Sequence, residues 1–213
     1  MEGLKELYDA IVTGNAKSAK ALTENALAEG VDPQVLIDKY MIPAMDEVGR
    51  LFEANEYYVP ELLISARAMK ASLQLIRPLL TAKGSEPQGR VAIGTVKGDL
   101  HDIGKNLVSA MLEGGGFEVI DLGVDVPPEK FIAAIQEKKA TVVAMSALLT
   151  TTMLSMKTTI DALQNAGVRN RVKIMIGGAA VTQRYADEIG ADGFSDNANS
   201  AVALARRLVA AQA

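Results

Sequence analysis

Hydrophobic residues in the first 82 positions recur at the spacing of a helix. Leu4, Leu7, Tyr8 and Ile11 fall at i, i+3, i+4 and i+7 and therefore share one helical face. Turn-forming residues divide the rest of this region into further helical stretches. We predict four helices that pack as a small bundle: residues 4–11, a second up to residue 30, a third from residue 33 with a kink near Pro43 to a break at 55–59, and residues 60–80.

The pattern changes after Lys83–Gly89, a polar stretch with two glycines and one proline that is predicted to be a linker. Short runs rich in β-branched residues then alternate five times with helical segments, which predicts an α/β fold with a flavodoxin-like, doubly wound, five-stranded parallel sheet. We expect a helical cap domain over residues 1–85 and a Rossmann-like domain over residues 86–213. The predicted strands are 90–96, 117–121, 141–146, 172–176 and 193–195, and the helices are 103–113, 128–138, 152–166, 182–189 and 197–211.

Composition excludes several kinds of chemistry. The 213 residues include 22 Lys or Arg and 26 Asp or Glu, and the net charge of -4 argues against nucleic acid or an anionic membrane as a partner. The absence of cysteine and the presence of a single histidine, His101, exclude disulfides, cysteine nucleophiles, iron–sulfur clusters and mechanisms that need two histidines. The first residues, MEGLKEL, carry an acid where a signal peptide would be basic, and no apolar run approaches a membrane span. We therefore expect a cytoplasmic protein.

Three loops of the predicted sheet are candidates for a functional site. Ligands of open parallel sheets bind beyond the carboxyl ends of the strands, near the point where the strand order reverses. The loops at 98–106, 146–152 and 177–179 follow the first, third and fourth predicted strands, which would be neighbours there. All three are rich in small, polar or turn-forming residues, and the first contains the histidine.

Several interpretations of the first loop compete. A phosphate-binding P-loop needs four residues between its first glycine and its Gly-Lys pair, whereas five separate Gly98 from Gly104 here. Asn106 also stands where that motif needs Ser or Thr. A histidine followed by an acid is typical of metal-dependent phosphohydrolases, but those need further histidines. A phosphoacceptor receiver domain would have an acid at the end of the third strand, where this chain has Ser146. A plain polar loop residue is the simplest alternative for an isolated histidine.

Asp99, two positions before His101, favours a metal ligand over a plain loop residue. An aspartate so placed can accept a hydrogen bond from one ring nitrogen and leave the other nitrogen free to bind a metal. One protein nitrogen cannot hold a free divalent ion, because such sites need three or four ligands. It can hold a metal that arrives with its other ligands in a macrocycle. Haem and corrin both satisfy this argument.

The sequence around these residues resembles the cobalamin-binding domain shared by methionine synthase and the corrinoid proteins of anaerobic methyltransferase systems. That family's signature is Asp-x-His-x-x-Gly, then Ser-x-Leu about forty residues later, then Gly-Gly. This chain has the three motifs in the same order at 99–104, 146–148 and 177–178. The stretches 48–52 and 57–62 are similar to the helical cap of the methyl-transferring branch. The resemblance covers nearly the whole chain and, without further catalytic domains, matches the free-standing corrinoid proteins.

The resemblance implies a cobalamin or related corrinoid cofactor, in the methylcobalamin form, bound base-off and His-on. His101 would replace the cofactor's dimethylbenzimidazole as the lower axial ligand of cobalt. Asp99 would hydrogen-bond His101 and tune its basicity, and Thr152 would continue this relay where the family usually has serine. As the histidine leaves and returns to cobalt during methyl transfer, Asp99 and the hydroxyl behind it would exchange a proton.

The resemblance also assigns residues to the rest of the cofactor. Ser146 and Thr150 would hydrogen-bond the displaced nucleotide tail, and Gly104, Gly177 and Gly178 would let the backbone approach it. The residues expected to contact the cofactor are Gly98, Asp99, His101, Asp102, Ile103, Gly104, Ser146, Leu148, Thr150, Gly177, Gly178, Phe52 and Val59.

The helical cap is expected to move during the reaction. Phe52 and Val59 would cover the upper face of the cofactor, although the family more often has Leu at the second position, and both residues also suit a plain helix core. A methyl group sealed under this cover could reach neither donor nor acceptor, so we expect motion to hinge at Lys83–Gly89.

The function implied by the resemblance is that of a methyl carrier without catalytic turnover of its own. Its partners would be a substrate-specific methyltransferase, an acceptor methyltransferase that uses tetrahydrofolate or a thiol coenzyme, and a reductive activase. The alternatives are a cobalamin-dependent sensor, which would need a DNA-binding module and tends to have a tryptophan in the cap, and a mutase subunit, which normally lacks this cap. The sequence leaves open which methyl donor is used.

Overall fold

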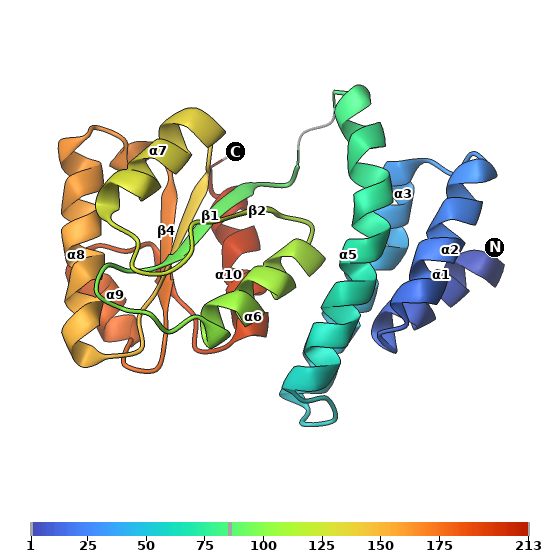
Figure 1. Cartoon of the computed structure of the whole chain (residues 1–213), viewed down its shortest axis with the longest axis horizontal. Coiled ribbons are helices and arrows are strands. Elements are labelled where there is room, and N and C mark those ends of the chain that lie inside the picture. The colour runs from blue at the N-terminus through green and yellow to red at the C-terminus, as the bar shows by residue number, and fades with distance from the viewer. Residues whose placement is uncertain (1, 85–86, 213) are drawn as a thin grey trace. The chain divides into compact units, whose positions relative to one another are not determined.

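The computed structural model describes residues 2–84 and 87–212 (Figure 1). The chain divides into two compact units, one of Met1–Pro87 with Ala110–Gly116 and one of Gln88–Ser109 with Phe117–Ala213. The domain boundary expected between residues 85 and 86 lies outside the described residues, as does the middle of the expected hinge. Within the part of the chain that the structure describes, no helix has the length and apolar character needed to cross a membrane.

The first unit contains the four expected helical segments. Asn15 and Asp32 begin the second and third by accepting backbone N–H bonds from Ser18 and Gln34, at 3.1 Å and 2.8 Å, as N-caps do. The long α5 continues through Pro78 without ending there. The elements are α1 (Glu2–Val12), α2 (Ala16–Ala28), α3 (Pro33–Leu36), a π-helix (Ile37–Met41), α4 (Ile42–Glu53) and α5 (Val59–Ala82).

The kink expected near Pro43 takes the form of a π-helical turn directly before it. Proline has no N–H, so the carbonyl of Lys39 lacks its usual partner four residues on. The Ile42 N–H instead bonds the carbonyl of Ile37, five residues back, and the helix widens over Ile37–Met41 without leaving helical dihedral angles. The predicted break at 55–59 is present, with Asn55 in the left-handed region at φ 59°.

The core of the helical unit is apolar apart from buried hydroxyl groups, which include those of Thr23, Ser65 and Ser72. The Thr23 hydroxyl donates to Ser72 Oγ at 2.9 Å, which joins α2 to α5. The Ser65 hydroxyl and the Tyr57 hydroxyl both donate to the carbonyl of Val12, at 2.9 Å and 3.2 Å, and so satisfy the end of α1. The largest fully buried side chains of this unit are Leu7, Ile11, Leu36, Met41, Leu62, Met69 and Ile76.

The second unit is the expected five-stranded parallel sheet, in the order β2-β1-β3-β4-β5. This is the flavodoxin-like order, and every observed strand lies within one or two residues of its predicted range. The strands are β1 (Arg90–Thr95), β2 (Glu118–Asp121), β3 (Val142–Ser146), β4 (Lys173–Gly177) and β5 (Gly193–Phe194).

Helices cover both faces of this sheet (Figure 1). Helices α7 and α8 are in contact, as are α8 and α9, and a buried cluster that includes Phe131, Met156, Ile160 and Ile174 fills the space between them and the sheet. Helix α10 packs against β3, β4 and β5. The helices are α6 (Ile103–Gly114), α7 (Pro128–Lys138), α8 (Thr150–Asn165), α9 (Gln183–Ile189) and α10 (Ala198–Ala210). Helix α8 begins two residues earlier than predicted.

Candidate functional site

The pairing register brings three strand ends together at one edge of the sheet. Thr95 of β1 is paired with Ser146 of β3, and Ser146 is paired with Gly177 of β4. The loops that follow these residues therefore start side by side. They are the loops in which the sequence predicted a site.

A short hydrogen bond joins His101 to Asp99 at this edge. The distance between His101 Nδ1 and Asp99 Oδ1 is 2.7 Å, and the His101 backbone N–H donates to the same oxygen at 3.0 Å. The carboxylate thus holds both the ring and the backbone of the histidine. This geometry makes Nδ1 the protonated nitrogen and leaves Nε2 with a free lone pair.

The second oxygen of Asp99 accepts two bonds from the neighbouring strand's loop. The Thr152 hydroxyl donates to Oδ2 at 2.6 Å and the Leu148 N–H donates to it at 2.8 Å. Asp99 is 1% exposed, so its charge is held by these donors rather than by water. The predicted chain of contacts from Thr152 through Asp99 to His101 is present in the geometry.

Opposing effects act on the Asp99 carboxyl. Burial by itself raises its pKa, but the bonds from Thr152, from the His101 and Leu148 N–H groups and from the His101 ring outweigh burial and hold the pKa well below its ordinary value. The group is therefore a carboxylate at neutral pH. A buried carboxylate next to Nδ1 makes the imidazole a better electron donor at Nε2.

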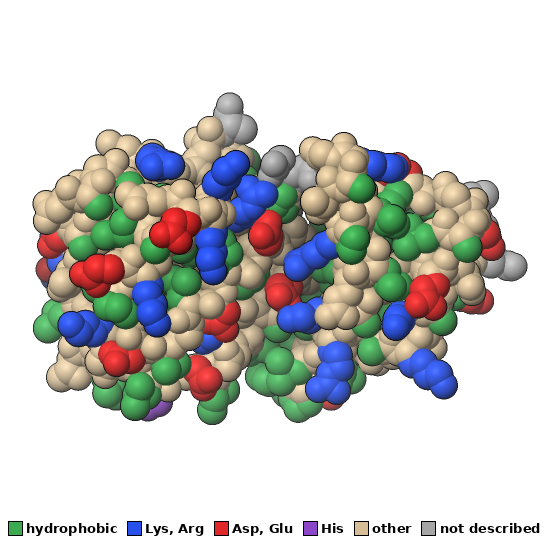
Figure 2. All heavy atoms as spheres, turned by 45° about the horizontal axis from the view of Figure 1, so that its top comes forward, with side chains coloured by type: hydrophobic (Ala, Val, Ile, Leu, Met, Phe, Trp, Pro, Cys, Tyr) green, Lys and Arg blue, Asp and Glu red, His purple; other side chains and the backbone are tan. Residues whose placement is uncertain are grey.

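The far side of the imidazole is open and has apolar surroundings. The His101 side chain is 53% exposed, and Nε2 has no hydrogen-bond partner among the described residues. Figure 2 shows the histidine, in purple, beside hydrophobic side chains at the rim of the sheet unit. Large apolar side chains with exposed surface in the adjoining segments are Leu100, Ile103, Leu148 and Leu149. A flat apolar ligand seated on Nε2 would cover surface that water otherwise contacts.

The histidine loop is anchored from below by β1 and α8. The buried Thr95 hydroxyl donates to the carbonyl of His101 at 2.9 Å, and the Ser155 hydroxyl of α8 donates to the carbonyl of Lys97, also at 2.9 Å. Gly98 has φ +86°, in the left-handed region that favours glycine, so the chain turns there immediately before Asp99.

The predicted residues after His101 begin helix α6. Asp102 accepts the Asn106 N–H at its carbonyl, at 2.7 Å, and the Asn106 side-chain amide at its carboxylate, at 3.0 Å, so its carbonyl accepts the first backbone bond of the helix. Ile103 is 84% exposed, and a Cβ on Gly104 would meet nothing within 4 Å. These positions leave open surface at the helix start, which is compatible with the predicted contact to a nucleotide tail.

The two glycines after β4 have different surroundings. A Cβ on Gly178 would lie 1.9 Å from the carbonyl oxygen of Ala147, and Gly178 has φ +126°, so only glycine fits there. A Cβ on Gly177 would lie 3.1 Å from the Ser195 carbonyl oxygen. At both positions the backbone of another loop of the protein approaches closely, and the predicted approach of these glycines to a nucleotide tail stays a prediction. Ser146 is half-buried and Thr150 is exposed in the first turn of α8.

Phe52 and Val59 belong to the helical unit, at the two ends of the turn between α4 and α5. The turn is held by the Glu56 and Tyr57 N–H groups, which both donate to the carbonyl of Leu51, at 2.9 Å and 3.0 Å. Phe52 is half-buried and Val59 is 40% exposed, next to the exposed Tyr58. Their predicted role as a cover over the cofactor stays a prediction.

Sequence reasoning missed two acidic residues that hold the loops of this edge. Lys105 was considered only as a P-loop lysine, yet it is buried, and its Nζ lies 2.6 Å from both carboxylate oxygens of Asp121 at the end of β2. Asp125, in the next loop, accepts the Gly98 N–H at 2.7 Å. A buried lysine needs an acid, but the burial of Lys105 is known only from the structure, so no sequence signal marked either Asp121 or Asp125.

The donor set fits a metal that brings its own ligands. Among the described residues, no three His, Cys, Asp or Glu side chains lie close enough to hold an ion together. The site instead offers one oriented imidazole nitrogen and an open apolar surface. This is what the cobalt of a corrin macrocycle requires of a protein, whereas a free divalent ion would require more ligands.

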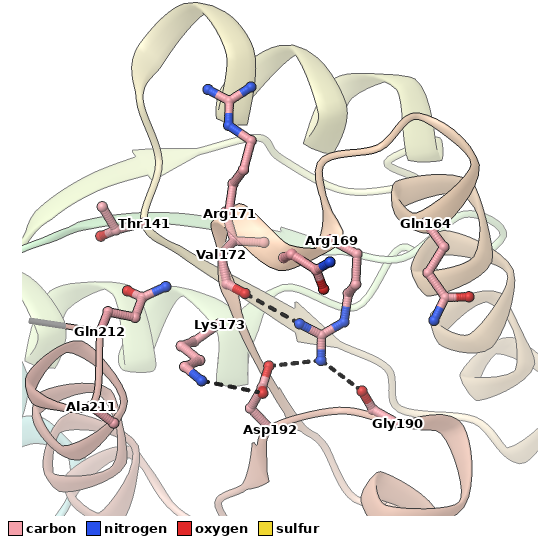
Figure 3. A pocket seen from close by; sticks show the side chains of 11 residues that line it. Thr141, Gln164, Arg169, Arg171, Val172, Lys173, Gly190, Asp192, Ala211 and Gln212 are labelled. Carbon is pink, nitrogen blue, oxygen red and sulfur yellow. Dashed lines mark hydrogen bonds and ion pairs between the residues drawn. The ribbon is translucent and has the colours of Figure 1, made fainter.

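A recess of about 760 Å³ lies at the opposite, amino-terminal edge of the sheet (Figure 3). Arg169 donates to Asp192 at 2.9 Å and to the carbonyls of Val172 and Gly190, and Lys173 Nζ lies 3.8 Å from the same carboxylate. Asp192 also accepts the Ile174 N–H at 2.7 Å. Three basic residues line the recess, and two of them, Arg169 and Lys173, are thus already paired with Asp192.

Comparison with known proteins identifies relatives along the whole chain. The B12 binding domain model matches residues 89–203, more than half of the chain, and a second B12 binding domain model matches residues 4–77. A trimethylamine corrinoid protein of Methanosarcina barkeri is 45% identical over 204 residues, covering 95% of this chain and 94% of its own. Dimethylamine corrinoid protein 1 of Methanosarcina acetivorans is 42% identical over 210 residues, covering 98% of each chain.

A solved structure agrees with these matches. A chain of the methanol:cobalamin methyltransferase complex of Methanosarcina barkeri superposes with a TM-score of 0.86 at 32% identity, over 98% of this chain and 80% of that one. Both units of the fold are therefore shared with a protein from a cobalamin-dependent system. On these matches, the chain belongs to the family of corrinoid proteins built from B12 binding domains.

Proposed function

We propose that this protein carries a methyl group on the cobalt of a corrinoid, between a substrate-specific methyltransferase and a second methyltransferase. The observation that carries the proposal is His101, which is fixed through Nδ1 by a buried carboxylate and exposes Nε2 on an apolar surface. A corrinoid bound there supplies a cobalt centre that accepts and releases a methyl group. His101 would hold this cobalt through Nε2 in place of the cofactor's own base, which is the base-off, His-on mode.

Asp99 would position His101 for the cobalt. Its carboxylate keeps Nδ1 protonated and the ring oriented, so that Nε2 stays directed at the same point. Thr152 keeps the Asp99 carboxylate charged and in place, because its hydroxyl donates to Oδ2.

The relatives support a one-carbon donor of the methylamine or methanol type. Those compared here are named for trimethylamine, dimethylamine and a methanol:cobalamin methyltransferase complex. The acceptor enzyme uses tetrahydrofolate or a thiol coenzyme, and a reductive activase restores the cobalt after oxidation. We expect the protein to act with these partners in the cytoplasm. No observation favours the sensor alternative.

Phe52, Val59 and the hinge complete the proposal. Both apolar residues flank one turn of the helical unit, next to the exposed Tyr58, Leu63 and Ile64. We assign this end of the unit to the upper face of the cofactor, where it shields the methyl group from water between transfers. Motion between residues 1–85 and 86–213 then gives each methyltransferase access.

A label-transfer experiment tests this function. The protein is loaded with methylcobalamin that carries a ¹⁴C-methyl group, desalted, and mixed with a thiol-coenzyme methyltransferase in one arm and a tetrahydrofolate methyltransferase in the other. A carrier passes the label to one acceptor, with a rate that falls in the His101→Ala variant. Label that stays on the protein in both arms, with no response to a methylamine or methanol methyltransferase, contradicts the carrier function and leaves a binding protein.

A further inference from the structure

The loop at 122–127, between β2 and α7, is bonded along its length to β1 and the histidine loop. The Thr95 N–H donates to the carbonyl of Gly123 at 3.0 Å, and the Val126 N–H donates to the carbonyl of Thr95 at 2.9 Å. Val96 and Val126 form an isolated parallel bridge. The loop therefore extends the pairing of β1 with its neighbour past the end of the sheet, up to the residues that precede His101.

Asp125, in the loop at 122–127, both donates to and accepts from the backbone of the histidine loop. Its Oδ1 accepts the Gly98 N–H at 2.7 Å, and its own N–H donates to the carbonyl of Asp99 at 2.9 Å. One residue thus fixes the backbone on both sides of the peptide that joins Gly98 to Asp99.

The conformation of Asp125 indicates that its side chain has a specific purpose. The residue is exposed and has φ +50°, in the left-handed region that favours glycine and that Asp and Asn tolerate better than other side chains. Core packing does not require it. Glycine would adopt this conformation without strain but could not accept the Gly98 N–H, so the carboxylate is the feature that glycine would lose.

The contact completes a clamp on the histidine loop. Strand β1 lies between β2 and β3, and the loop after it is bonded from both directions. Leu148 and Thr152, beyond β3, hold the Asp99 side chain, while Asp125, beyond β2, holds the Asp99 backbone. Without Asp125 the Gly98 N–H and the Asp99 carbonyl lose their partners, and the loop keeps only its bonds to β1 and α8, so its backbone gains freedom to shift relative to a carboxylate that stays fixed, and the direction of Nε2 shifts with it.

We propose that Asp125 is a positioning residue that sets the direction of His101 Nε2 and thereby the strength of the bond from histidine to cobalt. The proposal rests on the proposed function for its second half only. The geometric half concerns the protein's own backbone and is measurable without cofactor.

The first measurement uses the cofactor-free, full-length protein labelled with ¹⁵N. Hydrogen exchange of the Gly98 amide is compared in the wild type and in Asp125→Asn, Asp125→Gly and Asp125→Ala. Asn keeps an acceptor oxygen and tolerates positive φ, so exchange stays near the wild-type rate. Gly and Ala lack the acceptor, and exchange rises by about tenfold or more, the range expected for the loss of one hydrogen bond to a charged group.

The second measurement reports the ligand bond itself. The same variants are loaded with cob(II)alamin, and the fraction with an axial nitrogen is read from the nitrogen splitting of the electron paramagnetic resonance signal. Asn keeps the wild-type fraction, whereas Gly and Ala lose a large part of it. If Asp125 only stores strain, Gly98 exchange in Asp125→Gly is no faster than in the wild type and the axial-nitrogen fraction is no lower, which overturns the proposal.

The two measurements separate this proposal from the function it builds on. If Gly98 exchanges faster in Asp125→Gly and Asp125→Ala but the axial-nitrogen fraction is unchanged, Asp125 does not set the strength of the bond from histidine to cobalt. Unchanged exchange in all variants overturns the clamp. If the wild type binds no cobalamin, the proposed function fails, and the exchange data still decide whether Asp125 fixes the loop.

Discussion

The carboxyl and amino edges of the sheet contain similar pairs of charged or polar groups that have different roles. Each has an aspartate that accepts a backbone N–H and pairs with a basic side chain: Asp99 with His101 at the carboxyl edge, and Asp192 with Arg169 at the amino edge. Arg169 also donates to the carbonyls of Val172 and Gly190, so its guanidinium is committed to the fold. The imidazole of His101 is held by one nitrogen and presents the other to solvent.

This difference separates a binding site from a structural ion pair. The recess at the amino edge is the more obvious hollow, yet its charges largely satisfy one another (Figure 3). At the carboxyl edge the protein fixes a ligand atom without satisfying it. A side chain such as His101, which is positioned by several hydrogen bonds and keeps a free lone pair, can bind a ligand without lying in a deep pocket.

The largest effect is expected at a residue of the carboxyl edge that the fold itself requires. Gly178→Ala would put a Cβ 1.9 Å from the Ala147 carbonyl oxygen at φ +126°, so we expect a loss of more than about 3 kcal/mol in the free energy of unfolding. Urea denaturation measures it. Gly104→Ala, where a Cβ meets nothing, is the matched control and should change stability by less than about 1 kcal/mol. Equal stability of the two variants would contradict this account.

Removal of each aspartate gives the most direct contrast between the edges. Asp99→Ala and Asp192→Ala each leave backbone N–H groups without their acceptor, so both should lose about 2–3 kcal/mol of stability. Only Asp99→Ala should also lose the axial nitrogen of bound cob(II)alamin. A cofactor spectrum altered equally by the two variants would show that the amino edge takes part in binding.

A smaller effect, about 2 kcal/mol, is expected for Thr152→Val, which removes one hydrogen bond to the Asp99 carboxylate. Thr152→Ser keeps the hydroxyl and serves as control. The bond lowers the pKa of Asp99 in the folded state, so the stabilisation it provides is present above the ordinary carboxyl pKa and is lost as the pH falls through the folded pKa.

The pH dependence distinguishes the two Thr152 variants. In Thr152→Val the folded pKa of Asp99 moves up toward its unfolded value, so the difference in unfolding free energy between about pH 7 and about pH 3 should shrink. In Thr152→Ser it should stay close to the wild type. A Val variant with an unchanged pH dependence would mean that the hydroxyl does not act on Asp99.

The smallest effect is expected at the amino edge. Arg171 points away from Asp192 in Figure 3 and has no partner among the described residues. Arg171→Ala should change stability by less than about 0.5 kcal/mol and leave cobalamin binding unchanged. A loss of cobalamin retention on desalting would contradict the assignment of the cofactor to the opposite edge.

Sequence patterns predicted the fold closely because each unit has strong periodicity. The strand–helix alternation after Gly89 determined the sheet order, and Asp32 with Pro33 marked a helix start correctly. The π-helical turn before Pro43 was expected only as a kink, because the sequence shows that a helical bond is missing but not where the helix finds a substitute.

The candidate site divides in the same way. Asp99 and His101 could be found because they follow a strand whose end a parallel sheet brings beside the ends of its neighbours. Thr152 was named only because the chain resembles the corrinoid-protein family, which usually has serine there. The cofactor contact of Gly178 stays a prediction. Its steric need for glycine was not predicted, because that need depends on the approach of the Ala147 loop, which no local pattern records. Asp125 left no signal for a related reason: its bonds to Gly98 and Asp99 depend on how the loop after β2 folds over β1.

The central claim is that His101 Nε2 binds cobalt, and nitrogen labelling tests it most directly. Protein grown on ¹⁵N is loaded with unlabelled cob(II)alamin, and its electron paramagnetic resonance spectrum is recorded. An axial ¹⁵N from the protein splits each cobalt line into two, and this splitting should vanish in His101→Ala. Three-fold splitting, the signature of the cofactor's own ¹⁴N base, or a spectrum that His101→Ala leaves unchanged, would contradict the account.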